Sequence, residues 1–244
     1  MKTLNQQLQE IYQTYLNGIY SQPESWDDGV SAPLLMNVFS DYEKMERKIL
    51  FVGQETHSWE QMNLKPTLQE LQTKYLNFNL GKSADYKDGS RLRYLTSPFW
   101  NFSRTLFHNL NKANLEVTRK TNGFLWTNIS KFDCGSTTPD FKLQKDNPAG
   151  FHLLKEEVSI LKPDIVVFLT GTKYDCWIDT VFNPKREVII SEGFLTKFSV
   201  GDGSLPELTF QTKHPRTLIG SKKKNIANRY KEVIDKLTNS VMYP

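Results

Sequence analysis

The 244-residue sequence is poor in cysteine, with only Cys134 and Cys176. Two cysteines are too few for a disulfide framework or for an ordinary four-cysteine iron–sulfur cluster, and they favour a reducing compartment, which we take to be the cytoplasm. The four histidines lack close ligand spacing such as H-E-x-x-H, and this pattern indicates no metal site. A metal site assembled from distant residues remains an alternative, although nothing in the sequence asks for one.

The sequence also lacks long hydrophobic runs. No apolar stretch approaches the roughly 20 residues that span a bilayer, and the N-terminus has no continuous hydrophobic region typical of a secretory signal. We expect no membrane association. The hydrophobic residues, 38% of the chain, are nevertheless enough for a sizeable core, and the charged share of 24% is that of an ordinary globular protein.

Short apolar runs bounded by turn-forming residues alternate with amphipathic patterns along the chain. The runs predict five strands, at residues 48–52, 124–128, 164–169, 187–190 and 208–212. Three- and four-residue spacing predicts helices at 67–77, 98–110, 151–161 and 225–237. A first helix is predicted at the N-terminus, with one apolar side formed by Leu4, Leu8, Ile11, Tyr15 and Ile19. The alternation predicts an α/β fold, a three-layer α/β/α sandwich around a mostly parallel sheet.

We expect one domain across residues 1–244, acting as a monomer, because the sequence shows no internal repeat and no interdomain linker. Residues 1–45 are predicted to form an N-terminal helical extension, residues 46–220 the core and residues 221–244 a C-terminal helix. Two polar, turn-rich segments, 81–93 and 133–150, follow predicted strands. We expect both to be long surface loops that border a cleft.

The formal net charge of +4 is unevenly distributed. Residues 208–230 contain no acidic side chain. The basic residues of this segment are Lys213, Arg216, Lys222, Lys223, Lys224 and Arg229. A segment of one charge sign can attract a polyanion, most commonly nucleic acid. The alternative interpretation is the solvated, lysine-rich start of a helix.

Polar side chains stand where three of the predicted strands end. Gln54 and Glu55 follow the first strand, Asn128 ends the second, and His214 follows the last. In parallel sheets ligands bind beyond the carboxyl ends of the strands. We therefore expect Glu55, Asn128 and His214 to converge on one cleft, although each motif alone also fits an ordinary turn or cap.

These segments resemble motifs of the uracil-DNA glycosylase superfamily. Its first motif, G-Q-D-P-Y-H in the best-known branch, is similar to residues 53–57, G-Q-E-T-H. Its middle strand ends in Asn, as L-W-T-N does at Asn128, and its H-P-S-P-L motif is similar to H-P-R-T-L at 214–218. The resemblance covers roughly residues 48–218. It implies a divergent member with a uracil-DNA glycosylase-like fold that hydrolyses the N-glycosidic bond of uracil or a related damaged base in DNA. Such an enzyme is expected to need no metal, nucleotide or redox cofactor.

The resemblance also implies roles at the base. Glu55 stands at the position of the water-activating Asp, and His214 would donate to the base carbonyl. Asn128 would present a donor and an acceptor to the base edge. Gln54 would contact the base through its backbone or side chain, and His57 stands where the best-known branch has a Tyr that excludes thymine.

Further residues would hold the DNA. Tyr94 is our first choice for the aromatic side chain that stacks on a flipped base, and Phe99 is the second. Leu218 matches the apolar wedge that fills the vacated stack, and Arg216 replaces a phosphate-binding Ser. The basic residues expected to bind DNA beside them are Lys222, Lys223 and Lys224.

Three differences from the family pattern leave alternatives open. Glu55 in place of Asp moves the carboxylate by about 1.5 Å, and a misplacement of about 1 Å can cost on the order of a hundredfold in rate. The others are His57 and the Arg216–Thr217 pair. One alternative is a non-catalytic member of the fold that binds nucleic acid or a free nucleobase; another is a hydrolase of small nucleosides or nucleotides.

Overall fold

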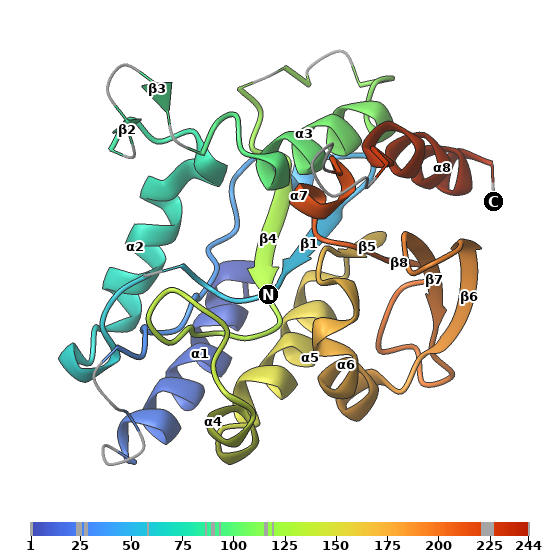
Figure 1. Cartoon of the computed structure of the whole chain (residues 1–244). Coiled ribbons are helices and arrows are strands. Elements are labelled where there is room, and N and C mark those ends of the chain that lie inside the picture. The colour runs from blue at the N-terminus through green and yellow to red at the C-terminus, as the bar shows by residue number, and fades with distance from the viewer. Residues whose placement is uncertain are drawn as a thin grey trace.

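A six-stranded sheet forms the centre of the molecule (Figure 1). The computed structural model describes residues 2–22, 26, 29–57, 59–85, 87–88, 91–92, 94–114, 117–118, 120–220 and 227–243. In spatial order the strands are β4 (Phe124–Asn128), β1 (Ile49–Gly53), β5 (Ile165–Phe168), β8 (Leu208–Thr212), β7 (Leu195–Ser199) and β6 (Lys185–Ile190). A separate pair, β2 (Lys87–Asp88) and β3 (Arg91–Leu92), lies outside it.

The sheet is mostly parallel, as the sequence predicts. Strands β4, β1, β5 and β8 run parallel, whereas β7 and β6 pair antiparallel at the far edge. Every residue of β1, β4 and β5 is buried, which is the pattern of strands covered on both faces by helices. The α/β architecture is thus confirmed.

Helices cover both faces of the sheet (Figure 1). They are α1 (Leu4–Tyr20), α2 (Leu68–Phe78), α3 (Pro98–Leu110), α4 (Phe141–Asp146), α5 (Ala149–Leu161), α6 (Asp175–Phe182), α7 (Pro215–Leu218) and α8 (Tyr230–Met242). Short 3-10 turns lie at Tyr42–Lys44, Met62–Leu64, Asn79–Gly81 and Gly171–Tyr174. Helix α3 packs with α7 and α8 on one face, and α5 packs with α1 and α6 on the other. None of the helices described is both long and apolar enough to cross a membrane.

The predicted elements at 98–110, 124–128 and 208–212 match α3, β4 and β8 residue for residue. The two predicted loops need correction, because 81–93 contains the β2–β3 pair and 133–150 contains α4 and the first residues of α5. The predicted apolar face of the first helix is confirmed, because Leu8, Tyr15 and Ile19 are buried and Leu4 and Ile11 pack partly buried against the core. Tyr12, which was not predicted on this face, is fully buried as well.

A buried ion pair explains the position of Tyr12. The Lys131 Nζ atom lies 2.6 Å from Glu157 Oε2 and 2.6 Å from Thr127 Oγ1, and neither charged side chain is exposed. The hydroxyl of Tyr12 donates to Glu157 Oε1 at 2.8 Å. Burial lowers the pKa of Lys131, which the Glu157 carboxylate opposes. The network joins α1, β4 and α5, so it fixes the strand that carries Asn128.

We expect the change Lys131→Met to lower the free energy of unfolding by about 3–5 kcal/mol, because it leaves the Glu157 carboxylate buried without its cation. Urea denaturation measures the loss. The matched control is Lys231→Met, which breaks the exposed i,i+4 pair with Asp235 and should barely move the urea midpoint. Equal losses in the two variants would contradict the structural role of the buried pair.

Candidate functional site

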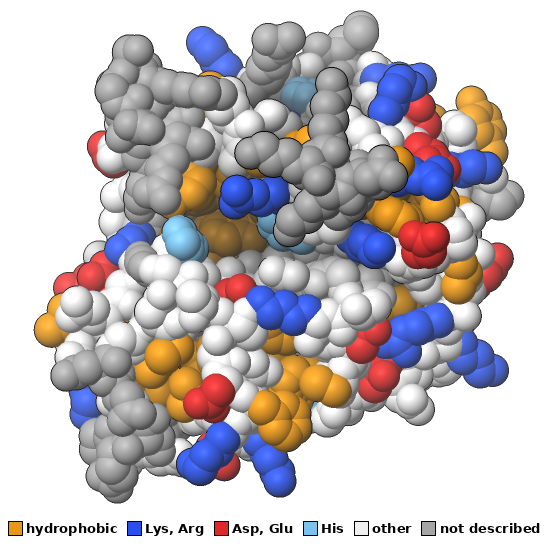
Figure 2. All heavy atoms as spheres, in the orientation of Figure 1, with side chains coloured by type: hydrophobic (Ala, Val, Ile, Leu, Met, Phe, Trp, Pro, Cys, Tyr) orange, Lys and Arg blue, Asp and Glu red, His pale blue; other side chains and the backbone are white. Residues whose placement is uncertain are grey.

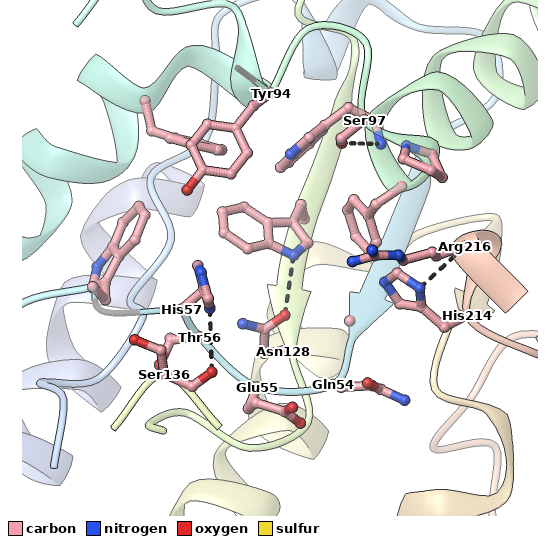
Figure 3. A pocket seen from close by; sticks show the side chains of 17 residues that line it. Gln54, Glu55, Thr56, His57, Tyr94, Ser97, Asn128, Ser136, His214 and Arg216 are labelled. Carbon is pink, nitrogen blue, oxygen red and sulfur yellow. Dashed lines mark hydrogen bonds between the residues drawn. The ribbon is translucent and has the colours of Figure 1, made fainter. Parts of the chain in front are cut away.

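A cavity of about 360 Å³ lies at the carboxyl ends of β1 and β4 (Figure 3). Glu55, Asn128 and His214, which the sequence predicts to converge, all line it. The other predicted residues on its wall are Gln54, His57, Tyr94, Phe99 and Arg216. In Figure 2 the cavity is a hollow with hydrophobic side chains at its base and a histidine on either side.

Aromatic rings form most of the apolar wall. The ring of Trp126 is met edge-on by Trp100, Trp59 and Phe99, with ring centroids 5.0, 5.9 and 6.3 Å away. Tyr94 also lines the cavity from the segment before α3. Rings arranged in this way provide flat apolar surfaces for a planar ligand. The wall therefore suits an aromatic or heteroaromatic ring.

Asn128 turns its amide nitrogen toward the cavity. Its Oδ1 accepts a hydrogen bond from Trp126 Nε1 at 3.1 Å, and because an indole N–H can only donate, the oxygen must face it. Asn128 is only 1% exposed, yet its buried Nδ2 atom has no hydrogen-bond partner among the described residues. In Figure 3 this nitrogen points to the side on which His57 lies. The site thus holds a buried donor that a ligand can satisfy.

His214 presents a second donor. It is the N-terminal cap of α7, and its Nδ1 accepts from the backbone N–H of Arg216 at 3.2 Å. In the neutral ring the proton therefore lies on Nε2. Burial lowers the pKa of His214, and the charges of Arg216 and Lys173 lower it as well, while the charge of Glu55 raises it. The ring stacks against Phe99 at 6.0 Å between centroids.

Glu55 lines the cavity, but its carboxylate turns away from Asn128 (Figure 3). It accepts hydrogen bonds from Thr138 Oγ1 at 3.0 Å, Lys173 Nζ at 3.1 Å and the Tyr174 hydroxyl at 2.7 Å. Lys173 Nζ also lies 3.4 Å from the second oxygen, so each of the two carboxylate oxygens accepts from two donors. Because the donors lie 83 to 119 residues away in the chain, no local sequence signal points to them.

Gln54 and His57 are also held by neighbouring carbonyl groups. The Gln54 side chain donates to the carbonyl of Thr170 at 2.8 Å and so turns toward the end of β5. The Nδ1 of His57 lies 3.2 Å from the carbonyl of Ser136. Because a carbonyl can only accept, Nδ1 carries the proton in the neutral ring, and Nε2 carries the lone pair.

Leu218 requires a correction. It is fully buried in the core, because α7 packs on α3 and turns this side chain inward, so it presents nothing to DNA in this conformation. The next residue, Ile219, is 43% exposed and is the apolar side chain at this surface. Arg216 is exposed, and its side chain reaches from α7 to the cavity (Figure 3). The remaining predicted DNA contacts, Lys222, Lys223 and Lys224, lie outside the described residues.

Sequence reasoning missed Trp126 and Gly53, which orient Asn128. The signal for Trp126 is its place two residues before Asn128 on a strand, where alternate side chains share a face. A β-carbon at Gly53 would lie 2.3 Å from Asn128 Oδ1, so only glycine leaves room for the amide. This contact depends on the strand register and cannot be read from the sequence alone.

No model of a known protein family matches the sequence, and no curated protein matches it significantly. The described residues also contain no group of three or more His, Cys, Asp or Glu side chains that could hold a metal ion. The aromatic walls of the cavity can hold a planar ring, and Asn128 and His214 can donate hydrogen bonds to that ring.

We expect His214 to titrate below its ordinary pKa of 6.5, so that the imidazole stays neutral at pH 7. The change Glu55→Gln should lower this pKa further, because it removes a negative charge that favours the imidazolium. Lys173→Gln should raise it, because it removes a positive charge. NMR titration of the ring protons, assigned with a His214→Asn variant, measures all three values. Shifts of the same sign in the two variants would contradict this electrostatic arrangement.

Proposed function

We propose that the protein is a DNA base-excision glycosylase, a divergent member of the uracil-DNA glycosylase superfamily that acts on uracil or a related damaged base. One observation carries the proposal: Glu55, Asn128 and His214, from three segments far apart in the chain, line one cavity with aromatic walls. The resemblance of the motifs implies this convergence. The mostly parallel six-stranded sheet is compatible with the fold of that superfamily.

The polar groups of the cavity suit the reaction. Hydrolysis of the N-glycosidic bond breaks the bond from C1′ of the sugar to the base and forms one from C1′ to a water oxygen. The sugar passes through an oxocarbenium-like state, and the base leaves as an anion. Hydrogen bonds from His214 Nε2 and Asn128 Nδ2 to carbonyl oxygens stabilise that anion. Glu55 orients the water and takes up its proton, which finally neutralises the base.

The surroundings of the cavity favour a nucleic-acid substrate. Arg216 lies at its wall and Lys173 beside Glu55, and basic side chains of this kind bind the phosphate groups of nucleic acids. Ile219 is the exposed apolar side chain directly after α7. We assign to Ile219 the wedge role that the motif resemblance gives to Leu218.

A specific observation favours a second candidate, a protein of the same fold that binds a nucleobase without cleaving it. The carboxylate of Glu55 is held by Thr138, Lys173 and Tyr174, and it turns away from Asn128. A water bound to this carboxylate must still reach C1′ of the sugar for catalysis. Glu55 is the only acidic side chain among the described residues that line the cavity. A cavity that binds the base but keeps this carboxylate out of reach would bind without hydrolysis.

A strand-cleavage assay separates the two candidates. Oligonucleotides with uracil, hypoxanthine, xanthine or an oxidised pyrimidine are treated with protein and then with alkali. We expect cleavage at one of these bases, and Glu55→Gln should abolish most of it without weakening DNA binding. His214→Ala should cost about 10²–10³-fold in rate, the typical cost of removing one preorganised donor.

The matched control is Glu187→Gln, the same change on the exposed edge strand β6, which should leave the rate unchanged. The change Glu55→Asp tests whether the longer side chain is matched to its site, in which case shortening it lowers activity. If the wild-type protein binds the oligonucleotides that contain these damaged bases but cleaves none of them, the second candidate is favoured.

Engagement of duplex DNA is tested by Ile219→Ala, which should reduce turnover on duplex more than on single strands, because only the duplex needs a wedge. Replacing Lys222, Lys223 and Lys224 together by Ala should weaken duplex binding and flatten its dependence on salt concentration, because fewer counterions are released. Fluorescence anisotropy at several salt concentrations measures the slope. A flat slope in the wild-type protein would favour a substrate with a single phosphate over a duplex.

A further inference from the structure

The carboxylate of Glu55 has its acceptor positions filled. Its two oxygens offer about four such positions. Oε1 accepts from Thr138 Oγ1 at 3.0 Å and from Lys173 Nζ at 3.1 Å, and Oε2 accepts from the same Nζ at 3.4 Å and from the Tyr174 hydroxyl at 2.7 Å. A water molecule can therefore donate to this carboxylate only after one of the three side chains leaves it.

The three donors differ in how easily they leave. Tyr174 is fully buried, and burial together with the charge of Glu55 raises the pKa of its hydroxyl, so the hydroxyl keeps its proton and continues to donate. Thr138 is a neutral, half-buried donor. Lys173 is charged, and 41% of its side chain is exposed. Because an exposed ion pair contributes little to stability, Lys173 is the donor that another anion can draw away.

A phosphate group is an anion that can compete for Lys173. Lysine binds phosphate as a point charge, and Arg216 on the wall of the same cavity adds a second cation. Figure 2 shows Lys and Arg side chains on opposite sides of the hollow. When Lys173 Nζ moves to a phosphate, one acceptor position opens on each oxygen of Glu55, while Thr138 and Tyr174 still hold one position each. The carboxylate then keeps its place and can accept a hydrogen bond from water.

We propose that Lys173 moves between the Glu55 carboxylate and a phosphate group of the substrate, so that Glu55 can bind water only when a substrate that carries phosphate is present. The inference rests on the proposed function in taking Glu55 as the residue that orients the water. It adds the class of substrate to that function: a strand or a nucleotide frees the carboxylate, whereas a free nucleoside leaves it occupied. Lys173 is thus a positioning residue, which acts through Glu55.

The first experiment measures binding and needs no catalysis. Fluorescence anisotropy follows a labelled single-stranded oligonucleotide that carries a tetrahydrofuran analogue of an abasic site. Glu55→Gln should tighten binding by about two- to fivefold, the range of an exposed ion pair, because the carboxylate no longer competes with phosphate for Lys173. In a Lys173→Met background the same change should leave the affinity almost unchanged. Equal effects in the two backgrounds, as general charge repulsion would give, or no binding by the wild-type protein, would overturn the proposal.

The matched control is the ion pair of Lys155 and Asp202. Its atoms lie 2.9 Å apart, its lysine is also 41% exposed, and neither residue lines the cavity. Asp202→Asn should have the same small effect on binding with and without Lys155→Met. A dependence on the lysine as large as the one at Glu55 would show that net charge alone produces it, and would overturn the competition at Lys173.

The second experiment measures base release from a deoxynucleoside, from its 3′- and 5′-monophosphates and from a single strand, with the base that strand cleavage identifies. Substrates with phosphate should have the higher kcat, and the two monophosphates show which phosphate draws Lys173 away. Lys173→Met should release the base from the nucleoside up to about fivefold faster than the wild type, because no ion pair then occupies Glu55. A lysine that only binds DNA would raise KM for the strand and leave the nucleoside rate unchanged, and that result would overturn the proposal.

Strand cleavage distinguishes a failure of this inference from a failure of the proposed function. If the effect of Glu55→Gln on binding depends on Lys173 but no oligonucleotide is cleaved, the glycosylase activity is contradicted and the competition for Lys173 is supported. Cleavage of a damaged strand, together with equal effects of Glu55→Gln in the two backgrounds, would do the opposite. Thermal unfolding of the single and double variants establishes that they are folded at the temperature of the titrations.

Discussion

The site depends on a close approach between two neighbouring strands. Gly53 of β1 and Asn128 of β4 are direct partners in the parallel register, and the amide oxygen of Asn128 lies where a side chain of residue 53 would start. Phe99 and Trp126 close over the same position, at 3.4 and 3.2 Å from that point. A side chain on β1 here would displace the amide, so the absence of one methyl group allows the amide, the indole and the ring of Phe99 to meet.

The two faces of β4 carry different chemistry. Successive side chains of a strand point to opposite faces, so Trp126 and Asn128 share the face of the cavity, and Thr127 points to the other. There it accepts from Lys131 and donates to Glu157, within a network that shows no exposure to solvent. Since β4 is an edge strand, the Tyr75 hydroxyl takes the place of a further strand at Trp126. The strand is therefore held on both faces and at its edge, which gives the amide of Asn128 a rigid base.

The sequence predicts those parts of the fold and site that depend on local pattern. Short apolar runs identify β1, β4 and β5, and the alternation of apolar and polar residues in L-T-F-Q-T identifies β8. The parallel order of these strands brings their carboxyl ends to one edge, where Glu55, Asn128 and His214 line a common cavity. Strand β7, L-T-K-F-S, mixes apolar and polar residues as β8 does but has the charged Lys197 at its centre, and it was not predicted. Helices α4 and α6 are too short for a clear helical period. The direction of the Glu55 carboxylate and the burial of Leu218 depend on distant partners, Lys173 and α3, which no local pattern reveals.

The two side chains that can donate into the cavity, Asn128 and His214, are oriented by other residues of its wall. Trp126 turns the amide nitrogen of Asn128 inward, and the backbone N–H of Arg216 keeps the proton of His214 on Nε2. Because burial lowers the pKa of His214, its neutral ring can donate a hydrogen bond from Nε2 to a ligand. Two fixed donors, with Arg216 nearby, form an environment that need not reorganise as negative charge develops. Two donors and a nearby cation thus suit a ring whose acceptor atoms carry negative charge better than they suit a cationic ring.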